Sequence, residues 1–227
     1  MSERKVPKKP DAAAGTRPAT KSKRSTTPRS SPDAASIYQL KVTLRDTDPA
    51  IWRRLLVPGE ISFRGLHQVL QVAMGWENEH LYEFKVGNRY FGEPEPKSWT
   101  VLIPNRTKDA GAVRLSDIAP RARTAFTYLY DMGDSWSHEV RVEKVLPREP
   151  EASYPVCLGG QRACPPEDCG GVWGYTDLLT ALEAADDPGW AELLDWTGPF
   201  DPEKFDLDAI NARLARLGAR RRRSRNR

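Results

Sequence analysis

The sequence has little cysteine and little histidine, and the cysteines are confined to one place. Of 227 residues, three are Cys and three are His, and every cysteine lies within the segment 157–169. Thiols gathered in this way are usually metal ligands, redox groups or a disulfide. An odd number of thiols cannot pair fully within one molecule, which argues against a structural disulfide.

Long apolar runs are also missing. No stretch of 18 or more apolar residues is present, so no membrane-spanning helix is expected. The N-terminal residues lack the apolar region of a signal peptide, which argues against secretion. We therefore expect a cytoplasmic protein with reduced thiols. Seven Trp, seven Tyr and six Phe are enough to build a substantial core.

The familiar catalytic signatures are absent as well. There is no P-loop, no Gly-x-Gly-x-x-Gly after a strand, no His-Glu-x-x-His and no Gly-x-Ser-x-Gly. His138 and Arg141 have the spacing of the His-x-x-Arg pair of tyrosine recombinases. Alternation along a strand would place these two side chains on opposite faces, which argues against that chemistry.

The charge is strongly segregated. The formal net charge is +4, but residues 1–35 hold nine Lys/Arg against three acids, and residues 213–227 hold eight Arg and no acid. The remaining residues carry 18 basic and 28 acidic side chains, a net charge of −10. We predict an acidic domain at about 36–217, a disordered basic tail at 1–35 and a basic C-terminal tail at 218–227.

The basic tails suggest contact with nucleic acid. Clustered Lys and Arg bind phosphate backbones without sequence preference and with steep salt dependence. The tails could instead keep the protein soluble or contact the acidic domain of a neighbouring molecule. The residues proposed for nucleic-acid contact are Arg220, Arg221, Arg222 and Arg223.

The central region predicts an α+β fold with a mainly antiparallel sheet, one early helix and a helical C-terminal part. Apolar residues alternate in the first half of the domain and follow helical spacing at its end. Ser62 is expected to cap the early helix and Gly75 to end it. The expected strands are 37–44, 51–57, 80–86, 89–91, 126–130 and 136–142, and the expected helices are 63–74, 175–185, 189–195 and 207–217.

All three histidines fall on apolar faces. His67 lies on the buried stripe of the early helix, and His80 and His138 lie on the inward faces of predicted strands. A single buried histidine is usually a core residue with a hydrogen-bond partner. Three together favour the interpretation that at least one lines a site.

The cysteines can be read as zinc ligands. Zinc prefers four tetrahedral thiolate or imidazole ligands. Cys164 and Cys169 have the spacing of a ligand pair, Cys157 could supply a third thiolate, and His138 or His80 could complete the site. The alternatives are small buried thiols in a structured loop between the sheet and the helices, or a redox pair.

Carboxylates offer a second candidate site. Asp131 and Asp134 follow a predicted strand and could coordinate a divalent ion or act in acid–base chemistry. The alternative is a turn in which their side chains accept hydrogen bonds from nearby backbone. Glu167, within the cysteine segment, is a further candidate base.

These motifs together resemble the plasmid pRiA Orf-three-like family, also described as the insertion-element passenger TnpR. The most specific are Tyr130-Asp-Met-Gly-Asp-Ser-Trp-Ser-His138 and Cys164-Pro-Pro-Glu-Asp-Cys-Gly-Gly171, supported by segments 38–44, 51–54, 66–76 and 80–84. The resemblance covers about 36–217 and implies a single α+β domain found on plasmids, mobile elements and bacterial chromosomes. It implies no particular reaction.

Three functional hypotheses follow. The favoured one is a non-enzymatic binding or accessory module of mobile elements, with an unidentified protein partner and nucleic acid held by the tails. The second is a metal-dependent, perhaps hydrolytic, enzyme that uses the Cys/His set with Glu167 or Asp131 as base. In the third, the cysteine segment is purely structural.

Overall fold

The computed structural model describes residues 36–93, 107–184 and 186–225, with side chains through residue 219. The predicted basic tail at 1–35 lies outside the described residues. No helix in these ranges is long and apolar enough to cross a membrane.

One eight-stranded sheet forms the centre of the domain, in the order β5-β4-β3-β6-β7-β1-β2-β8. Only β4 and β5 pair in parallel, and the other neighbours are antiparallel. The α+β class with a mainly antiparallel sheet is thereby confirmed. The strands are β1 (Ser36–Leu44), β2 (Trp52–Pro58), β3 (Tyr82–Val86), β4 (Arg89–Gly92), β5 (Thr107–Asp109), β6 (Ala125–Tyr130), β7 (Trp136–Pro147) and β8 (Val156–Gln161).

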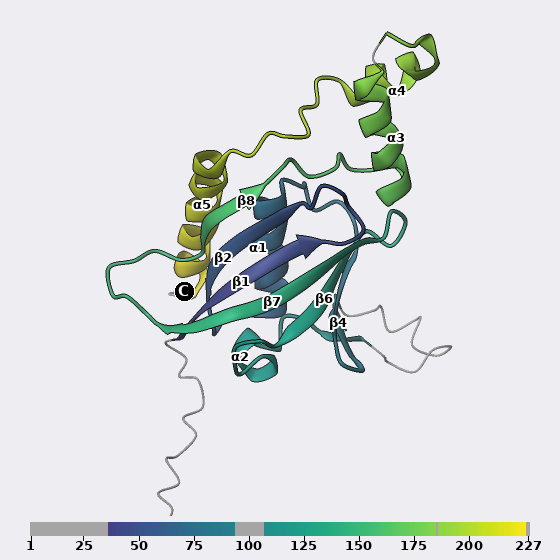
Figure 1. Ribbon diagram of the computed structural model, residues 1–227. Helices are drawn as coiled ribbons and strands as arrows, with labels where there is room; N and C mark the ends of the chain where they lie inside the picture. Colours follow the sequence, from purple (N-terminus) through teal and green to yellow (C-terminus); the bar gives the residue numbers. More distant parts are fainter. Residues whose placement is uncertain (1–35, 94–106, 185, 226–227) are drawn as a thin grey trace, which may run out of the picture. The chain divides into compact units, whose positions relative to one another are not determined.

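The early helix forms where the sequence predicts it. Helix α1 (Phe63–Met74) is capped by the Ser62 side chain, which accepts a hydrogen bond from the Gly65 amide, and it ends at Gly75 in the left-handed conformation. Its buried stripe packs on the sheet, where the Phe63 ring stacks 4.6 Å from that of Phe84. Figure 1 shows α1 behind the strands. A second, one-turn helix, α2 (Leu115–Ile118), was not predicted.

The cysteine segment is not wholly a loop, which corrects the sequence-based expectation. Its first cysteine, Cys157, lies in β8 at one edge of the sheet. Glycines 159 and 160 argue for a loop by composition, but an edge strand tolerates them. At Gly160 a side chain is excluded, because a Cβ would lie 2.6 Å from the Phe205 ring and 2.7 Å from the Trp52 carbonyl oxygen.

The C-terminal part is helical, as predicted, with shifted boundaries. The elements are α3 (Gly171–Glu183), the short 3₁₀ helix η1 (Pro188–Trp190), α4 (Ala191–Thr197) and α5 (Leu207–Arg225). Helix α5 runs beyond the expected end at 217 because the Ala- and Arg-rich sequence favours helix. The backbone of 220–223 is therefore helical.

Helix α5 lies along β8 and also packs against α1. One side chain joins helix and strand directly. The Asn211 side-chain oxygen accepts from the Cys157 amide at 2.7 Å, and its nitrogen donates to the Cys157 carbonyl at 3.0 Å. The amide of Asn211 thus satisfies both backbone groups of a residue in the outermost strand.

Candidate functional site

Three carboxylates converge on one histidine. The Nε2 atom of His80 lies 3.2 Å from Asp168 Oδ1 and 3.3 Å from Glu167 Oε2, and its Nδ1 lies 3.8 Å from Asp131 Oδ2. We call His80, Asp131, Glu167 and Asp168 the acid–histidine cluster. Its members come from the chain just before β3, the turn after β6 and the cysteine segment.

The turn after β6 fixes Asp131. Its backbone has φ 56°, in the left-handed region, and its Oδ1 accepts a hydrogen bond from the Gly133 amide at 2.8 Å. The residue is 7% exposed. With Oδ1 engaged by the turn, Oδ2 is the oxygen that faces His80. The turn expected from sequence thus also orients a carboxylate into the cluster.

Glu167 is held by its own partners. It accepts a hydrogen bond from the Glu77 amide at 2.8 Å, and the Tyr130 hydroxyl donates to its two oxygens at 3.1 and 3.0 Å. Burial and the neighbouring Glu167 carboxylate raise the pKa of Tyr130 to about 12. Tyr130 therefore stays protonated as a donor, and Glu167 is anchored at the boundary between the cluster and the adjoining cavity.

Three members of the cluster are close enough together to hold a metal ion. One ligand atom each from His80, Asp131 and Asp168 lies within 4.8 Å of the others, and no other group of three or more Cys, His, Asp or Glu in the described ranges does so. His80 Nε2 is buried and makes no well-directed hydrogen bond, although two carboxylates are close. An imidazole nitrogen and carboxylate oxygens together suit Mn²⁺, Fe²⁺ or Zn²⁺.

Asp134, the other aspartate of the turn, is used differently. Its Oδ2 accepts a hydrogen bond from the Gly170 amide at 3.1 Å, so it holds the end of the cysteine segment rather than facing His80. The sequence grouped Asp131 with Asp134, whereas the structure groups Asp131 with His80 and Asp168.

The remaining histidines are core residues with neutral partners. His138 is fully buried in β7, and its Nδ1 lies 3.2 Å from the Tyr128 carbonyl oxygen. His67 contacts the Tyr128 hydroxyl at 2.8 Å and the Asn78 side chain. Burial lowers the pKa of each imidazole to about 4. Both rings are therefore neutral at physiological pH, and neither belongs to the acid–histidine cluster.

The three cysteines are free thiols placed in different surroundings. Cys157 is in β8, Cys164 lines a cavity and Cys169 precedes α3. Within the described part of the chain, no group of three or more metal-ligand atoms includes a cysteine. Burial raises the pKa of Cys164 and of Cys169 to about 12, so both are protonated thiols at neutral pH.

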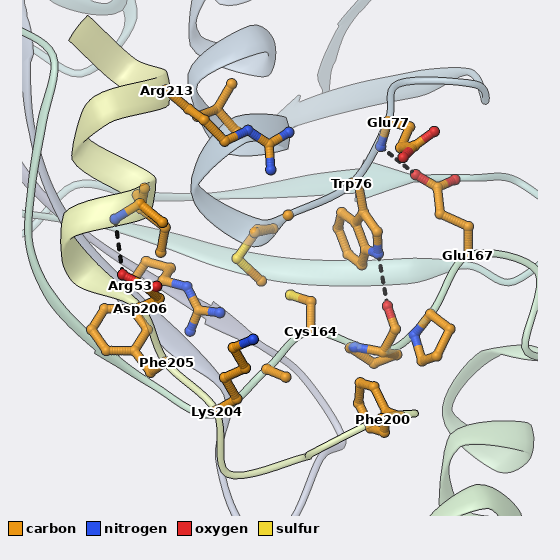
Figure 2. Close-up of a pocket in the computed structure, with 18 of the residues that line it drawn as sticks. Arg53, Trp76, Glu77, Cys164, Glu167, Phe200, Lys204, Phe205, Asp206 and Arg213 are labelled. Carbon is orange, nitrogen blue, oxygen red and sulfur yellow. Dashed lines mark hydrogen bonds between the residues drawn. The ribbon is translucent and has the colours of Figure 1, made fainter. Parts of the chain in front are cut away.

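A cavity of about 670 Å³ adjoins the cluster (Figure 2). It is bounded by the C-terminal end of α1, the segment 163–167 and the segment 197–213. Glu167 lines it and also belongs to the cluster. Trp76 forms part of its wall, with the indole nitrogen donating to the Pro165 carbonyl at 3.0 Å.

Sequence reasoning missed two residues of this region. Asp168 follows Glu167 directly, so the Pro-Pro-Glu-Asp sequence was a usable signal for a carboxylate pair. Arg53 lies on the buried face of its chain segment, which it shares with Ile51, Leu55 and Val57. A lone arginine at a position that the period-two pattern assigns to the core is a signal for a buried cation.

Comparisons with known proteins find one family model and similar proteins. A family model described as plasmid pRiA4b ORF-3-like protein matches residues 36–209. The chain is 39% identical over 177 residues to the uncharacterized protein y4hQ of Sinorhizobium fredii, covering 78% of this chain and 87% of that protein. It is similar to the crystal structure of MM3350, a protein of unknown function from Methanosarcina mazei, with TM-score 0.68, 35% identity and coverage of 77% and 96% of the two chains.

Proposed function

The chain belongs to the plasmid pRiA4b ORF-3-like family, and we propose that it is a non-enzymatic accessory module whose acid–histidine cluster binds one divalent metal ion. The observation that carries the proposal is the approach of three ligand atoms, from His80, Asp131 and Asp168, to within 4.8 Å of one another. A cation would neutralise carboxylates that otherwise repel each other at this distance. Metal binding would also join three chain segments at one point.

Metal titration tests this proposal. Calorimetric titration of Mn²⁺ and of Zn²⁺ into the reduced protein is expected to show one site. His80→Gln and Asp131→Asn should weaken binding at least about tenfold, since each removes a ligand. The matched control is Asp177→Asn, an exposed acid of α3 outside the cluster. Absence of binding, or equal weakening by the control, would contradict the proposal.

A metal-dependent hydrolase is a second candidate, favoured by the position of Glu167. The Glu167 side chain lines the cavity, and its carboxylate also faces His80. A molecule in the cavity would therefore lie next to a bound ion, with Glu167 available as general base. Hydrolysis of p-nitrophenyl acetate or bis-p-nitrophenyl phosphate in the presence of Mn²⁺, abolished in Glu167→Gln, would support this function over the accessory module.

Contact with nucleic acid through the C-terminal arginines is the third part of the proposal. It rests on the charge of the sequence at Arg220, Arg221, Arg222 and Arg223. We expect retention of double-stranded DNA or RNA at low salt, and weaker retention when all four are replaced by Gln. Replacement of Arg121 and Arg123, exposed residues of the domain, is the control. Unchanged retention after the fourfold change would contradict the proposal.

The proposal also includes a cytoplasmic location and a protein partner of the acidic domain. A reducing cytoplasm suits a protein with three free thiols. A protein partner of the acidic domain is proposed from the net charge of −10 over residues 36–212, which would favour a basic surface. Cross-linking at low and high salt tests this, because an electrostatic complex should dissociate as salt rises.

A further inference from the structure

The cavity beside the acid–histidine cluster has the size and composition of a small-molecule site. Its volume of about 670 Å³ lies within the roughly 300–1,000 Å³ typical of ligand pockets. One part of its lining is apolar and aromatic, including Trp76, Phe200 and Phe205. Another part is cationic and comprises Arg53, Lys204 and Arg213.

Arg53 supplies a buried positive charge that no carboxylate of the described chain neutralises. It is 2% exposed, and its guanidinium donates to four backbone carbonyls at 2.8 to 2.9 Å. The Phe205 ring lies 4.9 Å from its central carbon. A buried charge normally has an ionic partner. Four of the five N–H groups of Arg53 are therefore used by backbone carbonyls, which holds the side chain in place and leaves its positive charge without an anionic partner.

Two further cations reinforce this side of the cavity. Lys204 and Arg213 form no ion pair within the described residues, whereas the nearby Arg162 pairs with Glu203 at 3.0 Å. In Figure 2, Arg53, Lys204 and Arg213 lie to one side of Trp76, and Glu77 and Glu167 lie to the other. Asp206 is the exception, because Figure 2 shows it beside Arg53 on the side of the cations.

Of the four acids that also line the cavity, Glu77, Glu79, Glu167 and Asp206, the last two accept hydrogen bonds from other parts of the chain. Glu167 accepts hydrogen bonds from Tyr130 and from the Glu77 amide. Asp206 accepts from the Ala209 amide at 2.9 Å at the beginning of α5, and so acts as a helix cap. The cations Lys204 and Arg213, by contrast, form no ion pair within the described residues.

We propose that this cavity binds a small organic anion, with a carboxylate or phosphate head group against Arg53, Lys204 and Arg213. Its flat apolar body lies along Trp76 and Phe200. Aromatic side chains favour a planar ligand body, and the cations, of which Arg53 is buried and Lys204 and Arg213 are exposed, favour a charged head group. The site does not require metal at the acid–histidine cluster, and the two are tested independently.

The experiment compares probes that share a phenyl ring and differ in the charge of the attached group. Phenylacetate and phenyl phosphate are titrated into the wild-type protein with EDTA present, beside the neutral phenylacetamide and the cationic phenethylamine. We expect both anions to bind about tenfold or more tightly than the amide, and the amine not to bind. Which anion binds more tightly distinguishes a carboxylate ligand from a phosphate ligand.

Variants locate the binding. Lys204→Gln and Arg213→Gln should each weaken anion binding by about tenfold, the loss of one charge-assisted contact. Arg216→Gln on the same helix and Lys144→Gln in β7 are the controls and should bind as wild type. Arg53→Lys tests the buried cation, with circular dichroism confirming that the variant folds.

The proposal would be overturned by any of three results. These are equal binding of phenylacetate and phenylacetamide, wild-type anion binding by both Lys204→Gln and Arg213→Gln, or no binding of either anion at millimolar concentration. Since EDTA is present throughout, none of these results depends on whether the acid–histidine cluster binds metal.

Discussion

Gly171 lies so close to the backbone of Asp134 that a Cβ built on the glycine would be 2.6 Å from the Asp134 carbonyl oxygen. The neighbouring Gly170 amide donates to the Asp134 side chain at 3.1 Å. These contacts hold the end of the cysteine segment against the turn between β6 and β7. Because the turn carries Asp131 and the segment carries Asp168, this contact sets the spacing of the acid–histidine cluster.

Replacement of Gly171 by Ala should therefore lower the free energy of unfolding. Its φ of 68° alone costs a non-glycine residue about 1 kcal/mol or more, and the clash with Asp134 adds to this, for a total of about 2 kcal/mol. Urea unfolding measures the loss. Gly159→Ala is the control, because nothing lies within 4 Å of its Cβ position. Equal losses in the two variants would contradict this explanation.

Metal binding should raise thermal stability. An ion that binds only the folded chain stabilises it by about 2.7 kcal/mol at a hundred times its dissociation constant. The unfolding temperature should rise when Mn²⁺ is added and return when EDTA is added in excess. In Asp168→Asn, which removes one of the three convergent ligands, the rise should be largely lost. A rise of the same size in this variant would place the ion elsewhere.

The protein should lose stability in mild acid because of His67 and His138. Burial lowers the pKa of each to about 4 in the folded chain, below the usual 6.5. Between these values the unfolded chain binds more protons than the folded one, so stability is full above about pH 6.5 and falls as pH drops toward 4. From about pH 7 to pH 5 the expected loss is about 2 kcal/mol per histidine.

Urea unfolding across this pH range is the measurement, with His67→Gln as the test variant. The variant will be less stable at neutral pH, because it loses the ring stacked 3.6 Å from that of Tyr82. Its stability should nevertheless fall less steeply with acid than that of the wild type. An unchanged slope would show that His67 does not resist protonation in the folded state.

The thiols of Cys164 and Cys169 should react slowly in the folded protein. A pKa of about 12, raised from 9.0 by burial, reduces the thiolate fraction at any pH below 9 by roughly a thousandfold. Alkylation by iodoacetamide near neutral pH, followed by mass spectrometry, should leave both largely unmodified. In concentrated urea all three cysteines should react quickly. Rapid labelling of Cys164 or Cys169 in the native protein would contradict the raised pKa of that thiol.

The local signals in the sequence predicted much of the fold. Ser62 and Gly75 mark the ends of α1 because capping depends on the residues immediately around the helix termini. The β1–β2 hairpin follows in the same way from alternation and a turn. Strand β8 was missed because its glycines are poor strand formers, and its pairing with β2 depends on distant residues.

The candidate site was predicted only in parts, for a physical reason. Its residues come from three separate segments, and their approach depends on positive φ angles at Asp131 and Asp168 that no composition rule indicates. Asp131 was identified as a candidate ion ligand, and His80 as a candidate ligand of a different set. That these two meet with Asp168 follows from how the cysteine segment packs against the β6–β7 turn, which is a tertiary property.

The pair formed by Asn211 and Cys157 bears on self-association. β8 is the last strand of the sheet, and outward-facing amides and carbonyls of such a strand can template the addition of another chain. The Asn211 side chain forms hydrogen bonds with the backbone amide and carbonyl of Cys157, as a neighbouring strand would do at this position. Helix α5, which also carries the arginine-rich end of the chain, thereby hinders the pairing of another strand with β8, while β5 forms the opposite edge of the sheet.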